Sequence, residues 1–126
     1  ALVFITDIDR FKIINDKYGH SEGDIVLRKV AKIINDEVSK YGKLSRWGGD
    51  EFTGVMVGNR EIIENALQNI FTKLKSDENL KSYKLSISLG YTYTNFDIEM
   101  DEVLSKADKG LYLAKSKGGN HIEFIE

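Results

Sequence analysis

The feature that most constrains the fold is a continuously apolar run near the start of the chain, Leu2-Val3-Phe4-Ile5, which ends in Thr-Asp-Ile-Asp. A strand without polar alternation is typical of the middle of a sheet, where both faces are covered. The run therefore predicts a central strand in a sheet packed by helices, with two acids, Asp7 and Asp9, at its carboxyl end.

Helical and strand periodicities alternate along the rest of the chain. Paired glycines between two short apolar stretches predict a hairpin at Gly48-Gly49-Asp50. Gly90, inside a long alternating run, suggests a β-bulge, and the segment from Gly19 to Gly23 is expected to separate two helices. The expected order is strand 1–6, helix 9–18, a helix carrying Val26 to Tyr41, strands 43–47 and 51–57, a helix carrying Ile63 to Leu74, strand 84–94, helix 101–117 and strand 121–125.

This βααββαβαβ order predicts an α/β (α+β) fold with a mixed sheet packed by helices, for which the ferredoxin-like arrangement is the nearest simple relative. The 126 residues are enough for one core, and no linker or repeat divides them, so residues 1–126 are expected to form one domain.

Composition excludes several classes of function. Eighteen Lys and Arg against 20 Asp and Glu give a net charge of -2, without the basic bias of general nucleic-acid binding. There is no cysteine for a disulfide or a zinc-thiolate site, and no apolar run approaches the roughly 20 residues that cross a bilayer. We expect a cytoplasmic domain that contacts neither nucleic acid nor membrane, with membrane anchoring of a longer protein left open.

Acids gather where the first strand ends and at the hairpin. Mg²⁺ is usually bound by one or two carboxylates together with water and phosphate oxygens, so Asp7 and Asp50, one from each strand, could form such a pair. The alternative is that these acids, with Asp9 and Glu51, are simply solvated residues of a strand end and a turn.

Two further groups of residues could bind a nucleotide. The strand-to-helix junction before Lys12 can offer backbone amides to an anion. Asn15 and Asp24 bracket the break between two helices, and a carboxylate beside an amide matches the hydrogen-bonding edge of guanine. Each has a structural alternative, since Asn and Asp are common helix caps and a helical lysine is usually solvated. The spacing of residues in the sequence leaves open whether Arg46 and Lys115 bind phosphate or pair with neighbouring acids.

Several separated motifs, in one order, resemble the GGDEF family of diguanylate cyclases, whose members have a nucleotidyl-cyclase-like fold. The resemblance extends through Ser88-Leu89-Gly90 to Leu111-Tyr112-Leu113-Ala114-Lys115 and so covers nearly the whole chain. The motifs that carry it are Asp7-Ile8-Asp9-Arg10-Phe11-Lys12, Asn15-Asp16, Gly19-His20, Gly23-Asp24 and Arg46-Trp47-Gly48-Gly49-Asp50-Glu51-Phe52.

The resemblance implies a role for each matching position. Asp7, the carbonyl of Ile8 and Asp50 would hold Mg²⁺, with Mn²⁺ as an alternative, and Glu51 would serve a second ion or activate the attacking hydroxyl. The implied substrate-binding positions are Asn15 and Asp24 for guanine, Phe11, Lys12 and Lys115 around the triphosphate, and Gly48 and Gly49 in the turn. Two copies of the chain would each present one GTP, so a homodimer is expected for catalysis, with a sensory or regulatory domain attached.

Three departures from the family pattern stand out. The usual Gly-Arg-Asn after the last helix is Gly118-Gly119-Asn120 here, so a phosphate-binding arginine is missing, and Lys117 is a candidate substitute. The product-inhibition motif Arg-x-x-Asp would fall on residues 39–42, which read Ser-Lys-Tyr-Gly, so feedback through that site is not expected. The opening segment of the family is absent, which favours a fragment of a longer regulatory protein.

Two functions from different classes remain. The first is an active cyclase, supported by the intact acidic pair, guanine pair and hairpin turn. The second is a GTP-binding or dimerisation module that regulates an attached domain, for which Gly119 is the best argument. An RNA-binding module is disfavoured because it would carry basic and aromatic residues on exposed strands of the sheet, whereas this chain has acids at its strand ends.

Overall fold

The computed structural model describes all 126 residues and contains one five-stranded sheet with the strand order β2-β3-β1-β4-β5. β1 runs antiparallel to both β3 and β4, β2 is antiparallel to β3, and β5 is parallel to β4. The mixed sheet and the βααββαβαβ order are as predicted. The elements are β1 (Leu2–Ile8), α1 (Phe11–Tyr18), α2 (His20–Val38), β2 (Gly42–Arg46), β3 (Glu51–Met56), α3 (Arg60–Ser76), the 3-10 turn η1 (Lys81–Tyr83), β4 (Ile87–Tyr93), α4 (Met100–Ser116) and β5 (Ile122–Phe124).

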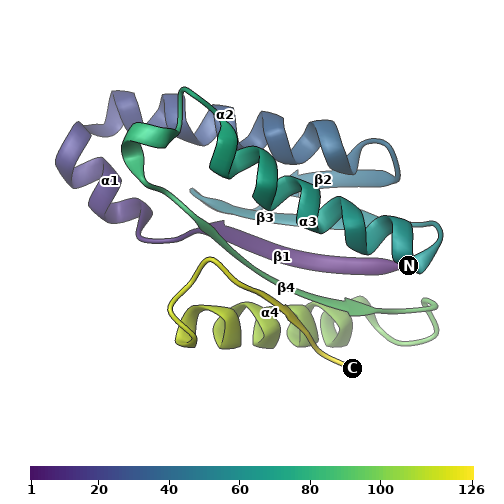
Figure 1. Ribbon diagram of the computed structural model, residues 1–126. Helices are drawn as coiled ribbons and strands as arrows, with labels where there is room; N and C mark the ends of the chain where they lie inside the picture. The colour runs from purple at the N-terminus through teal and green to yellow at the C-terminus, as the bar shows by residue number, and fades with distance from the viewer.

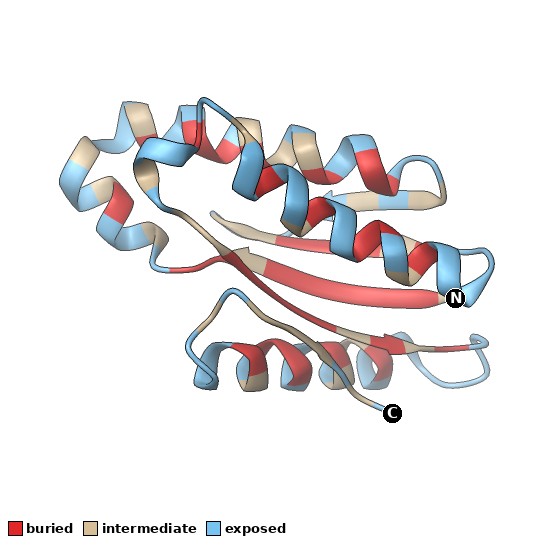
Figure 2. Cartoon of the chain, viewed as in Figure 1, coloured by how far each residue is buried: buried red, intermediate tan, exposed pale blue.

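Helices cover both faces of the sheet, with α1, α2 and α3 on one side and α4 on the other (Figure 1). Side chains of β1 alternate between these layers: Phe4 belongs to the large core with α2 and α3, and Ile5 packs with Ala107 and Leu111 of α4. The central strand is buried along most of its length (Figure 2). Residues of odd number on β1, including Asp7, therefore lie on the α4 side.

Three local predictions were wrong. β4 begins at Ile87, not at Lys84, because Lys84 adopts a left-handed backbone with φ of 52°. Gly90 forms no bulge, since it pairs in regular register with Ile5; its bare Cα instead lets α4 approach, where a Cβ would lie 2.1 Å from the Leu111 nitrogen. Only Gly19 separates α1 from α2, so Gly23 is a buried residue inside the second helix.

No helix combines the length and the apolar character that crossing a bilayer requires.

Candidate functional site

The predicted acidic residues meet on the two central strands. Asp7, near the end of β1, lies directly opposite Glu51, the first residue of β3. Directly opposed residues of antiparallel strands have Cβ atoms only about 4.5–5.5 Å apart. Asp50 precedes Glu51 at the end of the hairpin turn and is partly exposed. The structure thus brings together three acids that come from two separate motifs.

A lysine from α4 reaches this acidic group. The Nζ atom of Lys115 lies 2.6 Å from Oδ1 of Asp7 and 3.4 Å from Oδ1 of Asp9. Oδ1 of Asp7 is buried and accepts no hydrogen bond of good geometry, despite the short contact with this ammonium. Of the two roles left open for Lys115, the structure shows pairing with acids, and its ammonium is the one cation in contact with the buried Asp7 oxygen.

Burial and repulsion from neighbouring acids raise the pKa values of both Asp7 and Glu51. Burial raises the pKa of Asp7 from 3.8 to about 6, and the charges of Asp50 and Asp9 add to this rise while Lys115 opposes it. Burial also raises the pKa of Glu51, with repulsion from Asp108 and Asp50. Both raised pKa values indicate that a further positive charge beside Asp7 and Glu51 would be favourable.

Asp9 has a different environment from Asp7, and sequence reasoning did not foresee it. Its carboxylate accepts hydrogen bonds from the hydroxyls of Ser86 and Ser88, both at 2.6 Å, and from the Asn120 amide at 2.8 Å. Burial alone would raise the pKa of Asp9, but these hydrogen bonds hold it below its usual value. Asp9 therefore ties the end of β1 to β4 and to the turn after α4, and its oxygens are already engaged.

The proposed guanine-binding residues lie on the first two helices. Asn15 of α1 packs against Gly23 of α2 so closely that a Cβ on Gly23 would lie 1.7 Å from the Asn15 side-chain oxygen. Gly23 immediately precedes Asp24, so Asn15 and Asp24 flank one helix contact. Phe11 borders the same contact, 3.6 Å from that Cβ position, whereas Lys12 is exposed on α1 and makes no ion pair.

The hairpin turn presents bare backbone to solvent. Gly48 and Gly49 are exposed, and a Cβ on either would meet no atom within 4 Å. Arg46 donates two hydrogen bonds to the Gly49 carbonyl, at 2.7 and 3.0 Å, so its guanidinium braces the turn. A ligand can therefore approach this backbone without a side chain in the way.

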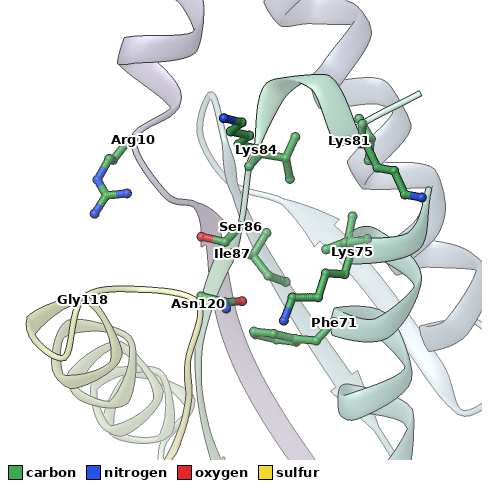
Figure 3. Close-up of a pocket in the computed structure, with 12 residues that line it drawn as sticks. Arg10, Phe71, Lys75, Lys81, Lys84, Ser86, Ile87, Gly118 and Asn120 are labelled. Atoms are coloured by element: carbon green, nitrogen blue, oxygen red, sulfur yellow. The ribbon is translucent and has the colours of Figure 1, made fainter. Parts of the chain in front are cut away.

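Two cavities lie beside Asp9 and its hydrogen-bond donors. A small polar one of about 160 Å³ is lined by Asp9, Arg10, Lys115, Gly118 and Gly119. A larger one of about 430 Å³ lies between α3 and the turn after α4 (Figure 3). The structure has no group of three or more His, Cys, Asp or Glu side chains that could hold a metal ion by themselves.

The chain is similar to known proteins in sequence and in fold. The sequence model described as "Diguanylate cyclase, GGDEF domain" matches residues 1–121. The chain belongs to the GGDEF-domain family. Diguanylate cyclase A of Treponema denticola is 35% identical over 125 residues, which cover 95% of this chain and 34% of that protein. Diguanylate cyclase DosC of Escherichia coli is 36% identical over 129 residues, covering 96% of this chain and 27% of DosC.

Solved GGDEF domains share the fold. The GGDEF domain of DgcB from Caulobacter crescentus, crystallised with c-di-GMP, has a TM-score of 0.85 and 26% identity, covering 98% of this chain and 76% of that one. This GGDEF domain spans about a third or less of the length of the two curated cyclases that it matches.

The turn after α4 carries both the position of the missing arginine, Gly119, and its candidate substitute, Lys117. Lys117 pairs with Glu123, at 2.7 Å from a carboxylate oxygen, and its role as a substitute for the arginine stays a prediction. Gly119 has a φ of 79°, and a Cβ there would lie 2.7 Å from the Asp9 carboxylate. The glycine is thus required by this conformation of the turn.

Proposed function

We propose that this chain is a diguanylate cyclase domain that condenses two GTP molecules into cyclic di-GMP and two pyrophosphates, with Mg²⁺ as the metal, at a two-fold interface between two copies. The observation that carries the proposal is the opposition of Asp7 and Glu51 on adjacent central strands, next to Asp50 and the bare glycine turn. Family membership and the names of the relatives support the same reaction.

The opposed acids Asp7 and Glu51, here called the acidic pair, fit a hard divalent cation. The burial of the Asp7 carboxylate and the raised pKa values of Asp7 and Glu51 favour a further positive charge here. Mg²⁺ takes oxygen ligands and usually only one or two protein carboxylates, so it does not need a group of three acids. We assign Asp7, the carbonyl of Ile8 and Asp50 to the metal, with Mn²⁺ as an alternative ion, and Glu51 either to a second ion or to activation of the attacking hydroxyl. When bound, the ion would neutralise charge on the attacking and leaving oxygens.

The residues of this chain would position the nucleotide and move one proton. Asn15 and Asp24 would hold guanine, with the Asp24 carboxylate accepting hydrogen bonds from N1–H and the exocyclic amine. Amides at the start of α1, at Phe11 and Lys12, would bind phosphate oxygens together with the ammonium of Lys115. Gly48 and Gly49 would let the ligand approach the turn.

In each of the two condensation steps, the 3′-oxygen of one GTP forms a bond to the α-phosphorus of the other. The bond from that phosphorus to the bridging oxygen of the β-phosphate breaks, and pyrophosphate leaves. Glu51 would accept the proton of the hydroxyl, a role that its raised pKa favours because a more basic carboxylate is a better general base near neutral pH.

Each copy of the chain would hold one GTP, so that the reacting groups meet only in the dimer. We propose that residues 1–126 form the GGDEF domain of a longer, cytoplasmically exposed protein with a sensory or regulatory domain, since the region shared with this chain is 34% and 27% of the two curated relatives.

A GTP-binding regulatory module is the second candidate. It is favoured by the turn after α4, where Gly119 offers no side chain and Lys117 is occupied by Glu123. One missing charged contact to phosphate is worth about 1.5–3 kcal/mol, or roughly ten- to a hundredfold in binding or rate.

The deciding experiment incubates the 126-residue chain with GTP and Mg²⁺ over a range of protein concentrations and quantifies cyclic di-GMP and pyrophosphate. Asp50→Ala removes a proposed metal ligand, and Asp36→Ala removes an exposed acid of α2 as the matched control. Product from the parent and the control but not from Asp50→Ala supports the cyclase. GTP binding without product at any protein concentration supports the regulatory module, and absence of both contradicts either nucleotide function.

A further inference from the structure

The larger cavity is separate from the acidic pair. It lies between the C-terminal half of α3, the segment 84–87 and the turn 118–120, and has a volume of about 430 Å³, within the usual range for small-molecule sites (Figure 3). Its apolar side is formed by Phe71, Leu74, Leu80, Leu85 and Ile87. None of the acids or glycines of the hairpin lines it.

The charge of the cavity wall is opposite to that of the protein. Arg10, Lys75, Lys81 and Lys84 line it and no carboxylate does, although the chain has a net charge of -2. Lys81 is paired with Glu78 outside the cavity, whereas the other three cations form no ion pair. Figure 3 shows Lys75 reaching from α3 toward Asn120 and Phe71. Three uncompensated cations around an apolar wall match a ligand with an anionic and an apolar part.

Backbone strain concentrates at the same place. Four residues other than glycine have positive φ in this chain, and three of them, Arg10, Lys84 and Asn120, line the cavity. For arginine and lysine this conformation costs roughly 1–2 kcal/mol per residue. Strained residues of this kind tend to cluster at ligand sites and switch regions.

Two residues of the wall connect the cavity to the acidic pair. Ser86 and Asn120 both donate to Oδ2 of Asp9, at 2.6 and 2.8 Å. Oδ1 of Asp9 in turn contacts the ammonium of Lys115, which lies against Asp7. A ligand that moves Ser86 or Asn120 therefore changes the position of Asp9 and of Lys115.

We propose that this cavity binds a small organic phosphate of mononucleotide size, with the ring on the apolar wall and the phosphate at the ammonium of Lys75, while Arg10 and Lys84 add positive charge at the rim, and that its occupancy shifts Asp9 and Lys115. The binding is independent of the proposed cyclase reaction, and only its effect on product formation rests on that function.

The test uses AMP, adenosine and inorganic phosphate as probes on the isotope-labelled 126-residue chain. AMP is chosen because adenine does not satisfy the carboxylate of Asp24 and so avoids the proposed guanine site. The variant Lys75→Gln/Lys84→Gln removes two cations from the cavity wall. Lys106→Gln/Lys109→Gln removes the same charge from α4, where Lys106 is partly exposed, Lys109 is exposed and neither forms an ion pair, and serves as the matched control.

The expected result is that AMP shifts the amide signals of Ser86 and Asn120, and binds the cavity variant about tenfold more weakly than the parent or the control. Adenosine and inorganic phosphate should each bind more weakly than AMP. Equal AMP affinity in both double variants, or shifts at Asn15 and Asp24 instead, would overturn the site.

Coupling is read from the signals of Asp9 and Lys115, which should move when AMP saturates the parent but not when it is added to the cavity variant. Unmoved signals at saturation would overturn the coupling. Where cyclic di-GMP forms, saturating AMP should change its rate by about twofold or more in the parent alone. A chain that makes no product contradicts the proposed function, while AMP binding and these signals still decide the site.

Discussion

Replacing Asp7 by Asn is expected to make the metal-free protein more stable. Asn has nearly the same shape as Asp but no charge, so it removes the repulsion and the desolvation that raise the pKa of this carboxyl to about 6. A rise from 3.8 to about 6 corresponds to roughly 3 kcal/mol, at about 1.4 kcal/mol per tenfold change in the ionisation constant. Because the side chain is 17% exposed and solvent screens part of its charge, we expect a gain of about 1–2 kcal/mol.

The pH dependence follows from the direction of the shift. The folded state binds the Asp7 proton more tightly than the unfolded state, so this residue lowers stability as pH rises from 3.8 through about 6. The advantage of Asp7→Asn should therefore be full near neutral pH and should disappear below about pH 4.

Urea unfolding of both proteins at about pH 7.5 and at about pH 3.5, without divalent ions, measures the effect as a difference in the free energy of unfolding. Asp36→Asn, at an exposed position of α2, is the control and should change stability by less than about 0.5 kcal/mol. Destabilisation by Asp7→Asn at neutral pH, or a gain that does not depend on pH, would refute the reasoning. Because Asp7 is a proposed metal ligand, the stabilised variant should also lose cyclase activity.

Three further substitutions test the environment of the site and of the core. Asp9→Asn should lower the free energy of unfolding by about 2–4 kcal/mol in urea titrations, since an amide cannot accept all the hydrogen bonds of the carboxylate, and an effect no larger than that of Asp36→Asn would contradict this. Gly119→Ala should lower the melting temperature more than Gly118→Ala, because both glycines have positive φ but only a Cβ at Gly119 meets another residue. Glu37→Gln should destabilise near neutral pH by about 1–3 kcal/mol. Burial would raise the pKa of Glu37, but its hydrogen-bond donors lower it, so the difference from the parent should vanish in acid as the carboxylate is protonated.

The parts of the fold that follow local periodicity could be predicted from the sequence. The apolar spacing in α3 anticipates the buried residues Ile63, Leu67 and Ile70, and the paired glycines mark the hairpin between β2 and β3. In these segments the local pattern and the final packing agree.

The errors occur where tertiary contacts decide the local structure. Gly23 reads as a helix break, yet it is buried in α2 because Asn15 occupies the space a side chain would need. The run before Ile87 reads as strand, but the Ser86 carbonyl accepts from the Asp9 amide, outside the regular ladder. Neither contact can be recognised from the periodicity of apolar residues in the sequence.

For the site as well, features that follow a local motif could be predicted, and features that depend on tertiary contacts could not. The motif residues Asp7 and Glu51 lie together as the hairpin and the first strand suggest, and their roles stay predictions. The contact between Lys115 and Asp7 joins residues from opposite ends of the chain, and the two serines that hold Asp9 are ordinary strand residues in sequence. Only the folded structure reveals that Asp9 holds β1 to β4 and to the turn after α4 through hydrogen bonds.

The central place of β1 also determines when the chain can fold during its synthesis. β1 is made before both of its neighbours, which are β3, through Leu2 opposite Met56, and β4, through Leu2 opposite Tyr93. Most of the chain must leave the ribosome before the second edge of β1 is paired, and until then an apolar strand with free amides remains available to other chains. Products of incomplete translation that end before Ile87 are therefore expected to aggregate or be degraded, and only a chain that includes β4 can complete the sheet.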